Sequence, residues 1–241
     1  MKRTLLAGAL TAILLLLSRM TTHAQSSVLL TARQHALVSI SAYTTKGDLP
    51  HLRTALTQGL EAGLTVNEEK EVLVQLYAYC GFPRSLSGIN TLMQVLDERK
   101  ASGIHDVVGK QASPITSTAP KYERGKQNLE KLTGKPETGP KIGANAFSPE
   151  SDVFLKEHLF ADIFERDVLN FQEREIATIS ALVSLGGVEP MLQAHIGMGM
   201  NTGLTEAQVQ EIIALDEAAI GKKAADAART VLAQALAAAK K

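Results

Sequence analysis

The chain is poor in the residues on which small disulfide-bonded and all-β proteins rely. Its 241 residues include one cysteine, Cys80, no tryptophan and few other aromatic residues. A single cysteine excludes an internal disulfide, so the core alone must hold an exported form of this chain together. The scarcity of aromatic residues, with abundant Ala and Leu, disfavours a β-sandwich and favours packed helices.

Charge of one sign is nowhere concentrated. The 25 Lys and Arg residues balance the 25 Asp and Glu residues, and no basic run is present. This distribution argues against a nucleic-acid partner, because a phosphate backbone needs clustered cations. No Gly-rich phosphate loop or serine nucleophile elbow occurs, and four histidines lack the spacing of a metal site: His35, His51, His105 and His158. We therefore expect no metal site at these histidines.

The N-terminus has the three parts of a secretory signal peptide. Residues 1–24 contain a basic start, an apolar run and the small-x-small sequence Thr22-His23-Ala24. The apolar run is about 15 residues, shorter than the roughly 20 needed for a membrane span. We expect cleavage after Ala24, export to the periplasm or the medium, and no membrane association thereafter. An uncleaved N-terminal anchor is the alternative.

Much of the remaining sequence belongs to an internal repeat. LTARQHALVSISAYTTKG at residues 30–47 aligns with LNFQEREIATISALVSLG at residues 169–186, and the similarity continues to a shared Gly-Leu-Thr. After that triplet, Thr65 and Thr205 each begin a capping box, with Glu68 and Gln208 three residues later. Each copy therefore predicts helix, turn, helix, stop and helix, and the pair indicates an internal duplication.

The repeat divides the chain into parts. We predict a first copy at residues 25–106, a linker at residues 107–148 with one short helix closed by Gly134, and a second copy at residues 149–241. The third helix of the first copy must break or kink at Gly81 and Pro83, whereas we expect no such break in the second copy and its Ala-rich C-terminal helix. The two copies should form one pseudo-twofold helical domain.

Two polar residues distinguish the second copy. Glu175 and His195 occupy positions where the first copy has Ala36 and Ala55. Both lie on apolar helix faces, and an antiparallel hairpin across residues 186–189 would bring them together. A half-buried Glu–His pair can transfer protons, and it can equally serve only to tie two helices together.

The segments ERE…LGG.EP.L.AH…GLT and YAYCGFPRS resemble the carboxymuconolactone decarboxylase family, over about residues 29–97 and 153–215. The resemblance implies an all-α bundle of the alkylhydroperoxidase D type, built here from a duplicated helix hairpin, that associates into a homo-oligomer. It also implies a cofactor-free lyase acting on a small anionic molecule, a carboxylated lactone or acid. His195 would then donate the proton and Glu175 would be its partner.

Four further residues are candidates for substrate binding. Arg174 or Arg166 could hold a substrate carboxylate with its guanidinium fork, although a solvated surface position is the alternative for each. Tyr79 or Phe82, at the expected helix break, could line the pocket that the second copy opens. These assignments follow from the resemblance and from the position of the break.

Two other functions remain open at this stage. In alkylhydroperoxidase D, a Glu, a Cys-x-x-Cys pair and a His form a thiol relay, but the cysteine positions fall near Val188 and Met191 here. A peroxidase with antioxidant activity would have to borrow a thiol, and we expect Cys80 to be a buried packing residue. A non-catalytic periplasmic binding protein is the third possibility.

Overall fold

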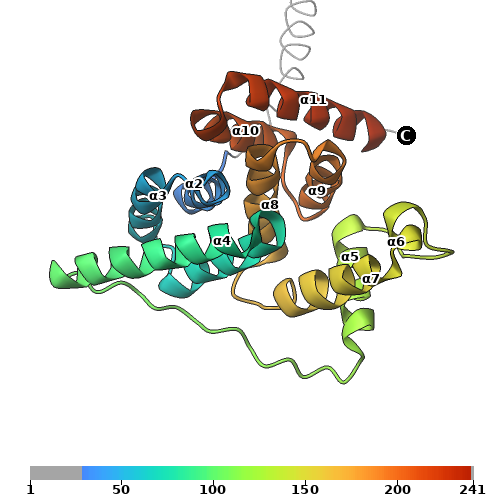
Figure 1. Ribbon diagram of the computed structural model, residues 1–241, viewed down its shortest axis with the longest axis horizontal. Coiled ribbons are helices and arrows are strands. Elements are labelled where there is room, and N and C mark those ends of the chain that lie inside the picture. Colours follow the sequence, from blue (N-terminus) through green and yellow to red (C-terminus); the bar gives the residue numbers. More distant parts are fainter. Residues whose placement is uncertain (1–28, 240–241) are drawn as a thin grey trace, which may run out of the picture.

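The chain forms an all-α fold. The computed structural model describes residues 29–239, and these contain no β-strand. The predicted signal peptide and its cleavage site lie outside the described residues. No helix in the described part is both long and apolar enough to cross a membrane. In chain order the helices are α2 (Ala32–Lys46), α3 (Leu49–Glu61), α4 (Val66–Ala101), α5 (Lys121–Thr133), α6 (Gly143–Phe147), α7 (Pro149–Phe154), the π-helix η1 (Leu155–Ile163), α8 (Phe171–Leu185), α9 (Glu189–Asn201), α10 (Glu206–Ile220) and α11 (Lys222–Ala239) (Figure 1).

Helices α2–α4 and α8–α11, called here the first and second units, follow the same plan. Helices α2 and α8 have 15 residues each, and each begins with a capping box, at Thr31 and Asn170. Helices α3 and α9 have 13 residues each and carry a proline in their first turn. The same local signals therefore start the same helices in both units, while their origin by duplication stays a prediction.

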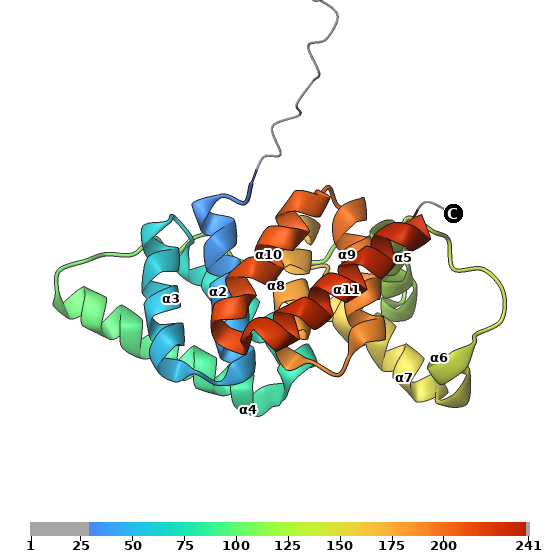
Figure 2. The ribbon, with the colours of Figure 1, turned by 90° about the horizontal axis from the view of Figure 1, so that it is seen from above.

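The helix break expected only in the first unit is present in both. Gly81 interrupts α4 with φ 80° and ψ 160°, and Gly221 separates α10 from α11 with φ 78° and ψ 160°. The expectation of an unbroken helix in the second unit is wrong, because only glycine adopts this conformation easily and Gly221 provides it. Helix α11 then lies across α9 and α10 (Figure 2).

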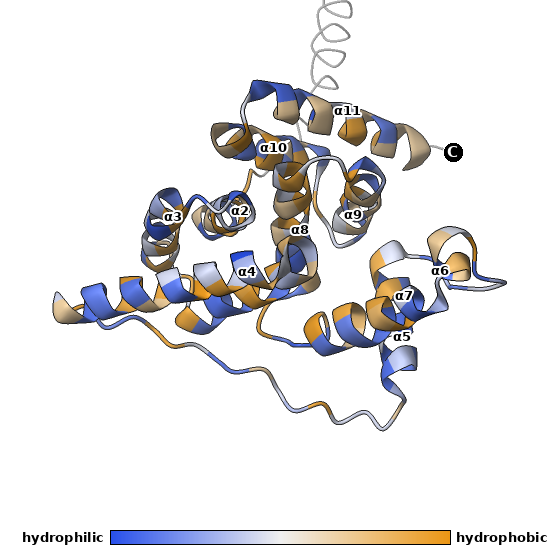
Figure 3. Cartoon of the chain, in the orientation of Figure 1, coloured by the Kyte–Doolittle hydropathy of each residue, from blue (hydrophilic) through white to orange (hydrophobic). Residues whose placement is uncertain are grey.

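Helix α8 lies at the centre of the molecule. Every residue from Arg174 to Ser184 is buried, and α8 packs against α2, α4, α9 and α10. Hydrophobic residues predominate in α8, whereas α4 carries a hydrophilic outer side (Figure 3). The main hydrophobic core combines side chains of both units, so neither unit has a separate core. One polar group in this core joins three helices: the Ser180 hydroxyl of α8 lies 2.9 Å from the Val38 carbonyl oxygen of α2 and 2.7 Å from Asp216 Oδ1 of α10.

The connection between the units folds into a side lobe. Helix α5 ends at Gly134 in the left-handed conformation, as predicted, and packs against η1 around a second hydrophobic cluster that reaches Met198 of α9. Two features differ from expectation. Helix α6 lies in the predicted linker in addition to its one expected short helix, and α7 is continued from Leu155 by π geometry.

Candidate functional site

Glu175 and His195 meet across the hairpin of α8 and α9. The glycines Gly186 and Gly187 have positive φ angles of 69° and 71°, which lets the chain turn sharply after α8. Helix α9 consequently folds back beside α8, and His195 Nδ1 lies 2.8 Å from Glu175 Oε2. The contact expected from the sequence is thus observed, and both side chains come from the interior faces of their helices.

The Glu175–His195 pair is almost completely buried, and each side chain has one polar atom outside the contact between them. Glu175 is completely buried, and His195 is 8% exposed. The Oε1 atom of Glu175 has no hydrogen-bond partner among the described residues. Because a carboxylate facing Nδ1 favours the tautomer with its hydrogen on that atom, Nε2 of His195 is the nitrogen left to exchange a proton with another molecule.

Tyr79 completes the surroundings of the pair. Its ring meets the His195 imidazole edge-on, with the ring centroids 5.7 Å apart and an interplanar angle of 81°. Burial raises the pKa of Tyr79, and the nearby Glu175 charge raises it further, so the phenol keeps its proton. The hydroxyl is buried, and its one polar neighbour among the described residues is Thr178, which lowers the pKa slightly against these effects.

Phe82 lies elsewhere. It is 61% exposed and stacks on Tyr77 with a centroid separation of 4.4 Å. The apolar cavity that the second unit forms, called here the α11 cavity, has a volume of about 380 Å³ and lies between the α8–α9 turn and α11. Neither Tyr79 nor Phe82 lines it, and the expectation that one of them would is wrong for this cavity. The reason is that α11, which begins after the unforeseen break at Gly221, closes it instead.

Arg174 is a core residue. Its Nη2 lies 2.8 Å from Glu71 Oε1 and its Nη1 lies 2.8 Å from Gln75 Oε1, both on α4 of the first unit. The side chain is completely buried, so the alternative of a solvated surface position is wrong. The apolar pattern of α8 alone did not show that α4 covers this face of the helix. Because its guanidinium already neutralises Glu71, Arg174 is poorly placed to bind a substrate carboxylate.

Arg166 belongs to a separate pocket. Its Nε donates to both oxygens of Glu71, at 2.9 and 3.1 Å, and the side chain is 43% exposed. With Lys70 and Gln111 it lines a pocket of about 330 Å³, whose walls include neither Glu175 nor His195. The structure thus brings Glu175, His195 and Tyr79 together and places the two arginines around Glu71. Sequence reasoning missed this role of Glu71, although its alignment with Glu211 in the repeat was a signal for it.

The single thiol is poorly suited to peroxide chemistry. The Cys80 Sγ–H donates to the Leu76 carbonyl oxygen at 3.2 Å, and burial raises the pKa of the thiol. A raised pKa lowers the thiolate fraction, and the thiolate is the nucleophile. Among residues 29–239, no group of three or more His, Cys, Asp and Glu residues is arranged to hold a metal ion.

Comparison with known protein families finds one match, in the C-terminal part of the chain. Residues 149–234 match the model of the Carboxymuconolactone decarboxylase family. The match begins at α7, includes Glu175 and His195, and ends within α11. It supports the resemblance predicted for residues 153–215, while the resemblance predicted for residues 29–97 lies outside the match and stays a prediction. No curated protein matches the chain.

Proposed function

We propose, taking residues 149–234 as a domain of the carboxymuconolactone decarboxylase family, that the protein is a cofactor-free carboxy-lyase acting on a small carboxylated lactone or acid. One observation supports this reaction above the others. A completely buried carboxylate, Glu175, lies 2.8 Å from the imidazole of His195, whose second nitrogen has no hydrogen bond to a described residue.

The residues suit a reaction that needs one proton. Loss of CO₂ breaks the bond between the ring carbon and the carboxylate, and the electron pair of that bond spreads into the unsaturated lactone. His195, protonated on both nitrogens, then donates the Nε2 proton to the ring carbon and keeps its Nδ1 hydrogen bond to Glu175. Glu175 is a positioning residue that stabilises the imidazolium. Water restores the proton afterwards.

One comparison favours this role over a purely structural tie. In the first unit, Ala36 and Ala55 are buried at the corresponding positions, so the hairpin packs without an ion pair there. A Glu–His contact of the same length outside the site, His35 Nε2 to Glu211 Oε1 at 2.8 Å, lies at the more exposed junction of α2 and α10 and provides a control. The raised pKa of Cys80 speaks against the peroxidase alternative.

The test is CO₂ release from a panel of small carboxylated lactones, with the full chain as catalyst. In His195→Gln, an amide replaces the imidazole and can still hydrogen-bond to Glu175. We expect this change to lower kcat by roughly 10²- to 10⁴-fold, the range of a general acid. His35→Gln is the matched control, because it alters the same type of contact outside the site and should leave kcat unchanged. Circular dichroism checks that both variants fold.

If His195→Gln turns over substrate as fast as the wild type, His195 is not the proton donor. If no member of the panel is decarboxylated but peroxide is consumed, Cys80→Ser decides whether that activity uses the thiol. If the chain only binds lactones, the outcome supports the non-catalytic binding protein instead.

A further inference from the structure

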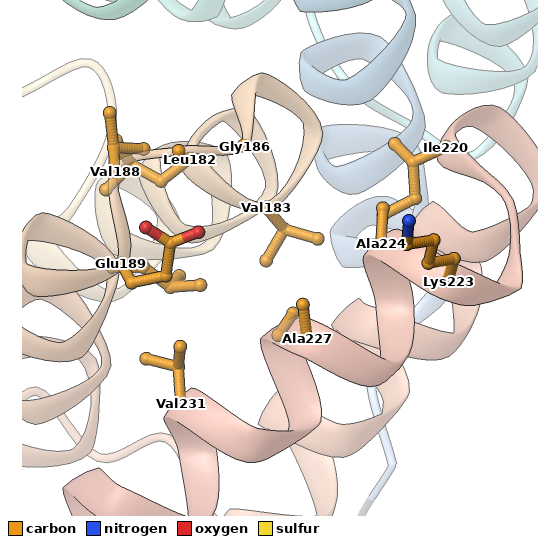
Figure 4. A pocket seen from close by; sticks show the side chains of 13 residues that line it. Leu182, Val183, Gly186, Val188, Glu189, Ile220, Lys223, Ala224, Ala227 and Val231 are labelled. Carbon is orange, nitrogen blue, oxygen red and sulfur yellow. The ribbon is translucent and has the colours of Figure 1, made fainter.

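The α11 cavity is an apolar space outside the Glu175–His195 pair. It extends along α11 from Lys223 to Val231, two helical turns or about 12 Å. Aliphatic side chains and glycines form its walls, and neither aromatic rings nor hydroxyl groups are among them. Figure 4 shows the side chains converging on an open centre; they include Leu182, Val183, Val188, Ala224, Ala227 and Val231.

The first unit shows why this space is open. There the guanidinium of Arg84 packs directly against Gly47, and the residue at the position corresponding to Arg84 in the second unit is Ala224. The groove between α3 and α4 has Ser87 and Thr91 where the second unit has Ala227 and Val231. The second unit thus lacks the side chain that fills this position and has aliphatic side chains in place of these two hydroxyl groups. What remains is an aliphatic cavity on the same scaffold.

Among residues 29–239, two charged side chains border the cavity, and they differ in sign. Lys223 and Glu189 lie on opposite sides of it (Figure 4). Lys223 is in the first turn of α11, and the preceding Gly221 has no side chain with which to cap the free backbone N–H groups. The positive end of the helix dipole therefore adds to the lysine charge, and this end of the cavity favours an anion.

We propose that the α11 cavity binds a medium-chain aliphatic monocarboxylate. The alkyl chain lies against the aliphatic walls of α8, α9 and α11, and the carboxylate is held by Lys223 at the beginning of α11. The far end of the chain approaches Glu189, whose negative charge disfavours a second carboxylate there. This site is independent of the proton-transfer reaction proposed for Glu175 and His195.

Calorimetric titration of the full chain with octanoate, decanoate and dodecanoate tests the class of ligand, below the concentrations at which they form micelles. We expect Kd to fall by up to about fourfold per methylene, the factor that corresponds to about 0.8 kcal/mol for each buried CH₂ group. Dodecanedioate and dodecylamine should bind much more weakly than dodecanoate. Equal binding of the amine, or affinities that do not depend on chain length, would overturn the proposal.

Paired variants locate the ligand. Ala224→Leu fills the cavity at the position of Arg84 in the first unit and should weaken dodecanoate binding at least tenfold. Ala233→Leu places the same side chain on an exposed part of α11 outside the cavity and should have no effect. If both variants bind as the wild type does, the ligand is elsewhere.

A second pair tests the head group. Lys223→Glu should weaken binding on the order of tenfold, because it replaces attraction by repulsion. Lys222→Glu changes the neighbouring lysine, which pairs with Asp226 and does not line the cavity, and should leave the affinity unchanged. Glu189→Gln should allow dodecanedioate to bind nearly as well as dodecanoate. If dodecanedioate still binds weakly to Glu189→Gln, Glu189 does not cause the preference for a monocarboxylate.

Discussion

The two units share their helices but differ in what they bury. Both have the capping boxes, the prolines at the second helix and the glycine that ends the third helix. In the aligned repeat, Glu175 and His195 of the second unit correspond to Ala36 and Ala55 of the first. The buried Glu69 of the first unit corresponds to Val209 of the second. Helix starts and stops define the scaffold, and the buried polar residues vary upon it. These buried groups are therefore where function is to be sought.

Removing the Glu175–His195 pair should produce the largest effect on stability. His195→Ala leaves the buried carboxylate without a partner, and we expect a loss of about 3–5 kcal/mol in the free energy of unfolding. The double variant Glu175→Ala/His195→Ala resembles the first unit and should lose less than the two single variants combined, with a coupling of about 1–3 kcal/mol. Urea unfolding of the four proteins at pH 7 measures this. Additive losses would mean that the two groups do not interact.

The two glutamates Glu71 and Glu211 provide a second contrast. Glu71 is 3% exposed and pairs with the completely buried Arg174, whereas Glu211 pairs with the half-exposed His35. Arg174→Met should lower the free energy of unfolding by about 3 kcal/mol, because the buried Glu71 then keeps only the half-exposed Arg166 as a cationic partner. His35→Gln should cost less than about 1 kcal/mol, the range of exposed pairs. Similar losses in both variants would show that burial does not determine how much these two ion pairs contribute to stability.

Glu69 should give the smallest of the three effects, with a distinctive pH dependence. Both carboxyl oxygens are buried without a partner among the described residues, and burial raises the pKa to about 9. Between the ordinary value of 4.5 and about 9, only the unfolded chain releases the proton, so stability falls as pH rises. Glu69→Gln removes this penalty and should stabilise the protein by at most about 3 kcal/mol at pH 7 and hardly at all at pH 4.

Thermal unfolding from pH 4 to pH 9 measures the Glu69 effect, with the exposed residue changed in Glu98→Gln as the control. We expect the difference in stability between Glu69→Gln and wild type to grow with pH and the control to follow the wild type. Parallel pH profiles of wild type and Glu69→Gln would mean that Glu69 is ionised in the folded protein.

Local features of the structure followed from the sequence. The capping residues, the stop at Gly134 and the meeting of Glu175 with His195 depend on residues within one hairpin or one helix end. Such features can be predicted because the chain between the interacting groups is short and its turn is marked by glycine. The two-glycine turn after α8 is the clearest case.

Features that depend on contacts between distant segments could not be predicted from the sequence. The burial of Arg174 requires α4, about 100 residues away in the sequence, to cover α8. The α11 cavity depends on the direction that α11 takes after Gly221, and Gly221 was difficult to recognise as a break because no proline follows it. The π geometry of η1 has no signature that we can identify in its sequence.

The shared hydroxyl at the centre of the molecule has a consequence for Asp216. Ser180 has one hydrogen to give, yet two acceptor oxygens lie within hydrogen-bond distance. If the hydrogen goes to Val38, the second contact exists only when Asp216 is itself the donor. Burial raises the pKa of Asp216 and so favours the protonated carboxyl group that could donate to Ser180. In that arrangement Asp216 donates to Ser180 and Ser180 donates to Val38, so an uncharged chain of two hydrogen bonds joins the three central helices.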